Sequence, residues 1–249
     1  MRVRVWGVVL GWLVLAGSLS AQQTDAFSRK NTWTMFAEYS NTSSHILLGA
    51  SRQRKIADFG GGYARRILHY RDSDFSYLAE VRPVLFESDP IEISQTTLTS
   101  TDSSKSTNFS SVGATVGPCV PSSGSVSFPP SGSLPGETET YNNTCGRQWT
   151  FGQAFSPIGF KYSMRTRHPV QPFTVATLGY MYTSRPIPVS NAEAFNFIFN
   201  FGAGVEVFRS RTRSVSLECR YNHFSNKDTA AVNPGVDNVV FKASYSFGR

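Results

Sequence analysis

The sequence predicts an all-β protein, an eight-stranded antiparallel barrel of the outer-membrane type, and three observations lead to this prediction. Segments in which apolar and polar residues alternate recur along the chain, and no segment has a convincing helical period. Charged residues make up 16% of the 249 residues and aromatic residues 13%, which excludes a disordered chain. Past the N-terminal segment, no apolar run approaches the roughly 18 residues that a membrane-spanning helix needs.

The N-terminal segment, residues 1–21, predicts an export signal. Arg2 and Arg4 precede an apolar run over residues 5–15, and small residues lead up to a cleavage site after Ala21. A short membrane anchor is the alternative, but the apolar run is too short for one. Removal of the two arginines lowers the formal net charge from +7 to +5, which requires no nucleic-acid partner. Residues 22–249 are then expected to form one barrel domain.

The first three expected strands cover residues 33–40, 56–68 and 75–85. In the first, Trp33 and Met35 alternate with polar residues, and the third repeats this pattern from Phe75 onward. The second contains three consecutive glycines. Each segment has the two-residue period of a strand with one apolar face.

The remaining five expected strands lie in the C-terminal part of the chain, from residue 158 onward. They cover residues 158–165, 170–183, 197–207, 215–222 and 239–247. The last of them ends on the alternating aromatics Tyr245 and Phe247, a pattern typical of substrates of the outer-membrane barrel-insertion machinery. An even number of strands is typical of an outer-membrane barrel.

A soluble β-sandwich is the competing architecture, and the connections favour the barrel. Those after the second, fourth and sixth strands are short, and those after the first, third, fifth and seventh are longer, so all long loops lie at one end. Charged Glu80, Arg82, Glu218 and Arg220 in mid-strand suit a polar lumen better than a sandwich core, where an unpaired charge costs several kcal/mol.

The longest connection, residues 89–146, is rich in Ser, Thr, Pro and Gly and predicts a mobile extracellular loop. Two of the three cysteines, Cys119 and Cys145, lie in it, and a disulfide between them is the simplest pairing for an exported protein. No Cys/His spacing resembles a metal site. The loop has an alternative interpretation as an adhesive surface.

The chemistry-bearing residues lie near the last connection. His223 and Ser225 are two apart on one strand and therefore point the same way, close enough for a histidine to activate a hydroxyl. Asp237, on the next strand, is placed to orient the imidazole across the antiparallel pair. All three share parity with the lipid-facing apolar series, where a polar group is costly and is by default a functional candidate. The alternative is polar anchoring of the barrel rim.

The block from Cys219 to Asn226, followed by Asn233-Pro234-Gly235-Val236-Asp237, resembles the lipid A 3-O-deacylase (PagL-type) family. The resemblance runs from about Phe155 to the end of the chain, is looser over 47–89, and is absent in the Ser-rich loop. It implies an eight-stranded outer-membrane enzyme that hydrolyses the ester-linked acyl chain at the 3-position of lipid A, with no metal or organic cofactor. Lipopolysaccharide of the outer leaflet would be its substrate.

The resemblance also implies roles for individual residues. Ser225 corresponds to the nucleophile, His223 to the general base and Asp237 to the orienting acid, where the best-known family members carry Glu. Asn226 would contribute to the oxyanion hole, although strict parity turns it toward the lumen. Two rim cations, Arg185 and Lys227, are weaker candidates for contact with the lipid A phosphates.

Two rival functions fit the same sequence pattern. One is a non-enzymatic barrel, an adhesin or a structural protein that displays the Ser-rich loop. The other is an esterase for a different ester, such as a secondary acyl chain or a phospholipid. The sequence gives no information on oligomeric state.

Overall fold

The computed structural model describes residues 27–100, 109–133 and 135–249, so the predicted export signal lies outside the described residues. Ten strands occur in this part of the chain, and it contains no helix long and apolar enough to cross a membrane. The strands are β1 (Asn31–Ser40), β2 (Lys55–Tyr70), β3 (Ser73–Ser100), β4 (Phe109–Val116), β5 (Ser122–Phe128), β6 (Glu137–Met164), β7 (Val170–Ile187), β8 (Glu193–Ser210), β9 (Arg213–Ser225) and β10 (Val236–Gly248).

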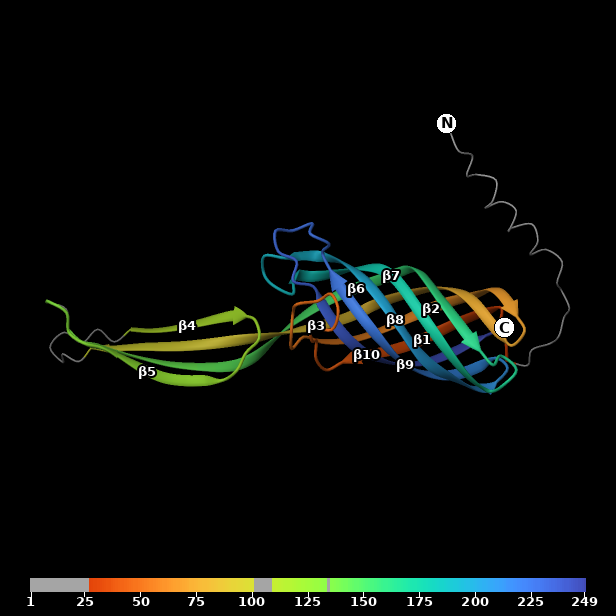
Figure 1. Ribbon diagram of the computed structural model, residues 1–249, viewed down its shortest axis with the longest axis horizontal. Coiled ribbons are helices and arrows are strands. Elements are labelled where there is room, and N and C mark those ends of the chain that lie inside the picture. Colours follow the sequence, from red (N-terminus) through yellow and green to blue (C-terminus); the bar gives the residue numbers. More distant parts are fainter. Residues whose placement is uncertain (1–26, 101–108, 134) are drawn as a thin grey trace, which may run out of the picture.

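Eight of these strands close into a barrel (Figure 1). They pair in the order β3-β2-β1-β10-β9-β8-β7-β6, and β6 pairs again with β3, so the ring has no free edge. Every pairing is antiparallel. Closure of the ring pairs the backbone groups of each wall strand on both sides, which is the condition for crossing a membrane with strands. The predicted fold class and the eight wall strands are thus confirmed, whereas β4 and β5 were not predicted.

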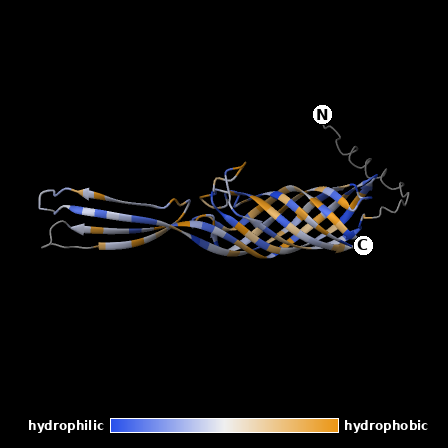
Figure 2. Cartoon of the chain, turned by 90° about the horizontal axis from the view of Figure 1, so that it is seen from below, coloured by the Kyte–Doolittle hydropathy of each residue, from blue (hydrophilic) through white to orange (hydrophobic). Residues whose placement is uncertain are grey.

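The outer face of the barrel is apolar, as the alternation predicts. Figure 2 shows apolar residues at alternate positions around the wall. The side chains of Trp33, Leu217 and Phe241 are more than half exposed, at 55%, 71% and 64%. Soluble proteins rarely expose so large an apolar surface, whereas outer-membrane barrels carry an apolar band that faces the lipid.

Charged side chains fill the lumen and pair with one another. Glu80 accepts hydrogen bonds from Arg82 at 2.8 Å, from Arg220 at 2.9 Å and from Lys242 at 2.5 Å. Glu218 accepts one from Arg220 at 2.6 Å. All of these residues are buried. The four mid-strand charges that favoured a barrel therefore lie in a paired interior network, as a polar lumen requires.

The stretch 89–146 differs from the mobile loop that its composition predicts. β3 and β6 continue their pairing past the barrel, from Ser88 opposite Trp149 out to Ser100 opposite Glu137. β4 adds to the outer part of β3, and β5 adds to the outer part of β6. The result is a projecting four-stranded sheet, here called the arm (residues 89–148), at the end of the barrel opposite the C-terminus (Figure 1). Ser and Thr form these strands because a ladder depends on backbone hydrogen bonds rather than on apolar side chains.

The connections follow the predicted asymmetry with one exception. At the end that holds the C-terminus, β2 joins β3 and β8 joins β9 through two residues each, and 165–169 join β6 to β7. The opposite end, here called the loop end, carries the arm and the connections 41–54, 188–192 and 226–235. The connection 188–192 has the same length as the connection 165–169. It is short because β7 and β8 extend beyond the expected strands 170–183 and 197–207. The expectation that it is longer is wrong.

Candidate active site at the loop end

The end of β9 and the start of β10 place His223 and Asp237 side by side. The two residues are directly opposite in the antiparallel register. Nδ1 of His223 lies 2.7 Å from Oδ1 of Asp237, within hydrogen-bonding distance. The predicted contact between these two residues is therefore present in the structure. A carboxylate on Nδ1 holds the imidazole so that Nε2 is left to exchange a proton with a third group.

Asp237 is completely buried, although it belongs to the outward-facing series of β10. The phenol of Tyr221 donates to its Oδ1 at 2.8 Å. The backbone N–H groups of Leu47 and Leu48 donate to its Oδ2 at 2.7 and 2.9 Å. These two residues belong to the connection 41–54, which lies over the outer wall at this point. The carboxylate therefore has all of its partners in place and a single orientation.

The connection 41–54 is attached to β10 by its backbone. Ser43 forms an isolated bridge with Asn238, and Ser51 forms one with Val236. Gly49 packs so close to β10 that a Cβ built on it would lie 2.5 Å from the backbone nitrogen of Asp237. The sequence pattern did not predict this part of the site. The only signal was Gly49 itself, which follows three apolar residues in a segment that lacks alternation.

Ser225 is the last residue of β9 and lies on the same face as His223. Both side chains are half-buried. In the part of the chain that the structure describes, no hydrogen bond joins Ser225 to His223. What the strand provides is a hydroxyl and an imidazole on one face, two residues apart, with the imidazole fixed by Asp237.

Aromatic residues of the neighbouring strands flank Ser225 on the outer wall. Phe197 of β8 is directly opposite Ser225 and is 42% exposed. Its ring contacts Phe195 at 5.3 Å between centroids, and Phe195 stacks on Tyr180 at 5.9 Å. The hydroxyl therefore lies beside an exposed apolar surface, which suits the acyl part of a lipid better than a polar substrate.

Asn226 is the first residue after β9, and it is buried. Its Nδ2 donates to the Val232 carbonyl at 2.9 Å, and its Oδ1 accepts from the Asp228 backbone at 3.0 Å. The side chain thus holds the connection 226–235 together. The amide nitrogen carries two hydrogens, so one donor remains after the bond to Val232.

The two predicted head-group cations differ in their surroundings. Arg185 is half-buried and donates to the Trp149 carbonyl at 2.6 Å and to Thr150 Oγ1 at 2.7 Å. Lys227 is exposed and has a positive φ of 52°. Both lie at the loop end, Arg185 near the end of β7 and Lys227 directly after Asn226. Neither hydrogen-bonds to the His223–Asp237 pair, and of the two only Lys227 is exposed.

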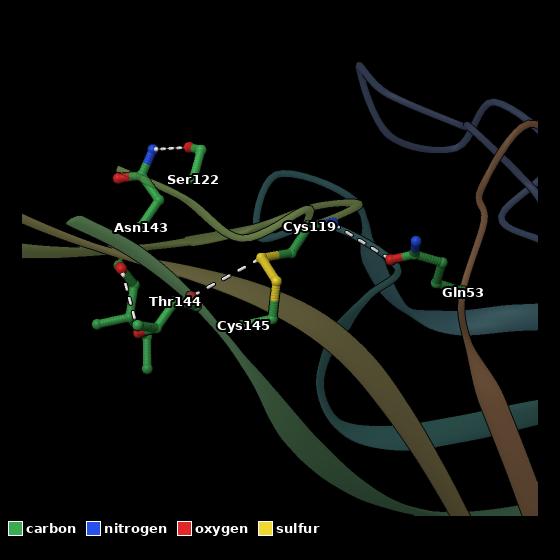
Figure 3. The surroundings of a disulfide bond; sticks show 7 residues. Gln53, Cys119, Ser122, Asn143, Thr144 and Cys145 are labelled. Atoms are coloured by element: carbon green, nitrogen blue, oxygen red, sulfur yellow. Dashed lines mark hydrogen bonds between the residues drawn. A yellow bond between two sulfur atoms is a disulfide. The ribbon is translucent and has the colours of Figure 1, made fainter. Parts of the chain in front are cut away.

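The disulfide Cys119–Cys145 lies in the arm, with 5.7 Å between the two Cα atoms (Figure 3). The backbone nitrogen of Cys119 donates to Gln53 Oε1 at 3.2 Å. Gln53 belongs to the same connection, 41–54, that covers Asp237. The third cysteine, Cys219, is free and exposed on the outer wall.

A closed eight-stranded ring with an apolar exterior and a charged interior defines this protein as an outer-membrane β-barrel, and it carries a His–Asp pair on its outer wall. The family model described as lipid A 3-O-deacylase (PagL) matches residues 124–246, about half of the chain. The family resemblance predicted from the sequence is thus confirmed. At the level of the family, the chain is related to outer-membrane lipid A deacylases.

Three solved structures illustrate the similarity to known proteins. The outer membrane enzyme PagL is 11% identical, with a TM-score of 0.49 over 85% of this chain and 97% of that chain. Neisserial surface protein A is 12% identical, with a TM-score of 0.38 over 88% and 97%. OprG from Pseudomonas aeruginosa is 11% identical, with a TM-score of 0.40 over 90% and 99%. No curated protein matches the sequence.

Proposed function

We propose that this chain is an outer-membrane serine esterase that removes the ester-linked acyl chain at the 3-position of lipid A. The observation that supports this most directly is the His223–Asp237 pair at 2.7 Å on the lipid-facing wall. An ionisable residue on a lipid-facing wall is by default a functional candidate, and here the carboxylate is placed to orient His223. Residues 1–21 would serve as the export signal, and the loop end would face the outside of the cell.

In the proposed reaction, Ser225 is the nucleophile and His223 is the general base. Oγ attacks the ester carbonyl while Nε2 accepts the hydroxyl proton, and Asp237 stabilises the imidazolium. The sugar oxygen leaves with that proton, which gives an acyl-serine. Water then attacks the acyl-serine with His223 again as the base, and the free fatty acid is released. The remaining N–H of Asn226 would stabilise the oxyanion.

The position of the site fits a substrate that stays in the membrane. The aromatic surface around Phe197 would hold the acyl chain, and the ester would meet Ser225 at the boundary with the head groups. Lys227 and Arg185 would contact the lipid A phosphates, Lys227 more readily because its side chain is exposed. Lipopolysaccharide in the outer leaflet is therefore the substrate that the position of the site favours.

The decisive test compares Ser225→Ala with Ser190→Ala, an exposed serine of the connection 188–192. Each variant is expressed in a Gram-negative host, and lipid A is analysed by mass spectrometry. Ser225→Ala should leave lipid A fully acylated, while Ser190→Ala should still produce the lighter species. Both should retain heat-modifiable mobility, which shows that the barrel is folded. Deacylation by the Ser225→Ala variant would overturn the proposal.

The position of the cleaved ester needs a separate measurement. Mass analysis of the released fatty acid separates a 3-hydroxylated primary chain, expected for 3-O cleavage, from the non-hydroxylated chain of a secondary ester or a phospholipid. A non-hydroxylated product would overturn the assignment to the 3-position.

A further inference from the structure

The connection 41–54 folds down over the outside of the barrel rather than over its mouth. Asp237 faces outward in the β10 alternation, and this connection is what buries it. Two of its backbone N–H groups bind Oδ2 of Asp237, and its Gly49 packs against the backbone of the same residue. The residues that make these contacts, and Ile46 before them, must therefore lie on the lipid side of the wall.

These residues form an exposed apolar tip, Ile46-Leu47-Leu48. Their side chains are 39%, 68% and 67% exposed. Three consecutive exposed apolar residues at the head of a lipid-facing wall are costly in water. They lie over Asp237, two residues along β10 from Val239, which is 41% exposed in the apolar belt whose partner is the hydrocarbon of the bilayer. The occupant that fits this surface is therefore lipid acyl chains.

We propose that the connection 41–54 is a membrane-coupled positioning element of the active site, an inference that rests on the proposed esterase function. Its tip enters the acyl-chain layer of the outer leaflet. Its backbone, through Leu47 and Leu48, holds the carboxylate that orients His223. The same two residues therefore touch the lipid with their side chains and the catalytic acid with their N–H groups, so that contact with the bilayer steadies the His–Asp pair.

Substitutions can separate the membrane contact of the tip from the positioning of Asp237. The membrane contact depends on the side chains of the tip, and the positioning depends on where its backbone lies. The double change Leu47→Ser and Leu48→Ser removes the apolar side chains and keeps both N–H donors. The change Gly49→Ala keeps the tip and displaces the backbone, since a Cβ there would lie 2.5 Å from the Asp237 nitrogen and 2.7 Å from the Val236 carbonyl carbon.

The first experiment measures the activity of the Leu47→Ser/Leu48→Ser variant on lipid A in vesicles and on a soluble short-chain ester. The activity on vesicles divided by the activity on the soluble ester should fall about tenfold or more, because the apolar contact with the bilayer is lost. The fall should come from a higher KM for the vesicle substrate. Val112→Ser, at a 69% exposed residue of the arm, is the matched control and should leave the ratio unchanged. An unchanged ratio for the double variant would overturn the membrane contact.

The second experiment compares Gly49→Ala with Gly117→Ala, whose Cβ would meet no atom within 4 Å. Gly49→Ala should lower kcat on both substrates about tenfold or more, since the acid is displaced from His223. Gly117→Ala should leave kcat unchanged. Full kcat in a folded Gly49→Ala variant would overturn the positioning role.

A spin label supplies a readout that does not depend on activity. In a Cys219→Ser background, a label at Leu47→Cys should be accessible to oxygen and shielded from a water-soluble nickel reagent in lipopolysaccharide-containing vesicles. A label at Val112→Cys should show the reverse. A water-exposed label at residue 47 would overturn the insertion of the tip. Deacylation by Ser225→Ala would instead overturn the esterase itself, so the two failures are distinguishable.

Discussion

The imidazole of His223 and the carboxylate of Asp237 meet across the β9–β10 ladder, with Nδ1 and Oδ1 2.7 Å apart. The carboxylate is completely buried on an otherwise lipid-facing wall. Because its other partners are Tyr221 and two backbone N–H groups, it is held in place from three sides. This enclosure determines how substitutions of Asp237 should behave.

Asp237→Asn should reduce kcat by about 10³- to 10⁴-fold, the size of effect seen when the acid of a catalytic triad becomes an amide. The amide cannot stabilise the imidazolium, and its NH₂ group would face N–H donors of Leu47 and Leu48 or the phenol of Tyr221. The measurement is the rate of fatty-acid release from purified lipid A. A loss smaller than tenfold would show that the carboxylate is not part of the catalytic group.

Asp237→Glu restores the carboxylate of the best-known family members but adds a methylene to a fully enclosed site. We expect kcat to lie between those of the native chain and Asp237→Asn, roughly tenfold below the native value, because the added volume displaces the carboxylate from His223. If Asp237→Glu is as inactive as Asp237→Asn, the expectation is wrong, and the enclosed site does not tolerate a side chain longer than Asp.

The sequence was sufficient to predict the barrel because each wall strand obeys one local rule. Leu217 and Glu218 point to lipid and lumen respectively because successive side chains on a strand point to opposite faces. The opposition of His223 and Asp237 followed from the same rule and from antiparallel pairing. Features that obey local periodicity were therefore predictable.

Features that depend on contacts between distant segments were not predictable. Leu47 and Asp237 are 190 residues apart, and their hydrogen bond depends on where an irregular connection folds. The arm was missed for a related reason: its strands are rich in Ser and Thr, so their pairing leaves no apolar alternation in the sequence. Asn226 was assigned by resemblance, and its bond to the Val232 carbonyl depends on the path of the connection 226–235.

Glu80→Gln should destabilise the barrel more than Glu218→Gln does. Glu80 binds Arg82, Arg220 and Lys242, whereas Glu218 binds only Arg220 in the described network. Loss of the Glu80 charge removes one of the two carboxylates that Arg82, Arg220 and Lys242 share and leaves Glu38, at 3.1–3.6 Å, as the other. Breaking buried ion pairs in this way costs up to about 3–5 kcal/mol. Urea unfolding in detergent, followed by heat-modifiable mobility, gives both free energies of unfolding. Equal values for the two variants would contradict the central role of Glu80.

Removal of the disulfide should affect the arm and not the barrel. Cys119→Ser/Cys145→Ser should make the arm more sensitive to proteinase K, because a crosslink over 26 residues contributes roughly 3 kcal/mol to local stability. The native chain should also change its gel mobility on reduction, after heating in detergent. Cys219→Ser removes a free thiol and should change neither property. Mobility that does not depend on reductant would argue against the crosslink.

Replacement of the arm tests whether the projecting sheet is needed for catalysis. Pro90 and Arg147 are directly opposite in the β3–β6 register, so Asn-Gly in place of residues 91–146 joins them through a two-residue hairpin turn. The barrel part of the β3–β6 pairing, from Ser73–Met164 to Ser88–Trp149, is retained. We expect a folded, heat-modifiable barrel that still deacylates lipid A, since neither His223 nor Asp237 hydrogen-bonds to the described residues of the arm.

The activity that remains in the shortened chain shows whether the arm acts only indirectly, through Gln53, or is part of the active site. Gln53 joins the arm, through Cys119, to the connection that orients Asp237. If that contact steadies the connection, Gln53→Ala should reproduce the loss of kcat in the shortened chain, and we expect both losses to stay within about threefold, the effect of one neutral hydrogen bond. A shortened chain that folds but is as inactive as Ser225→Ala would show that the arm, and not only the outer wall, belongs to the active site.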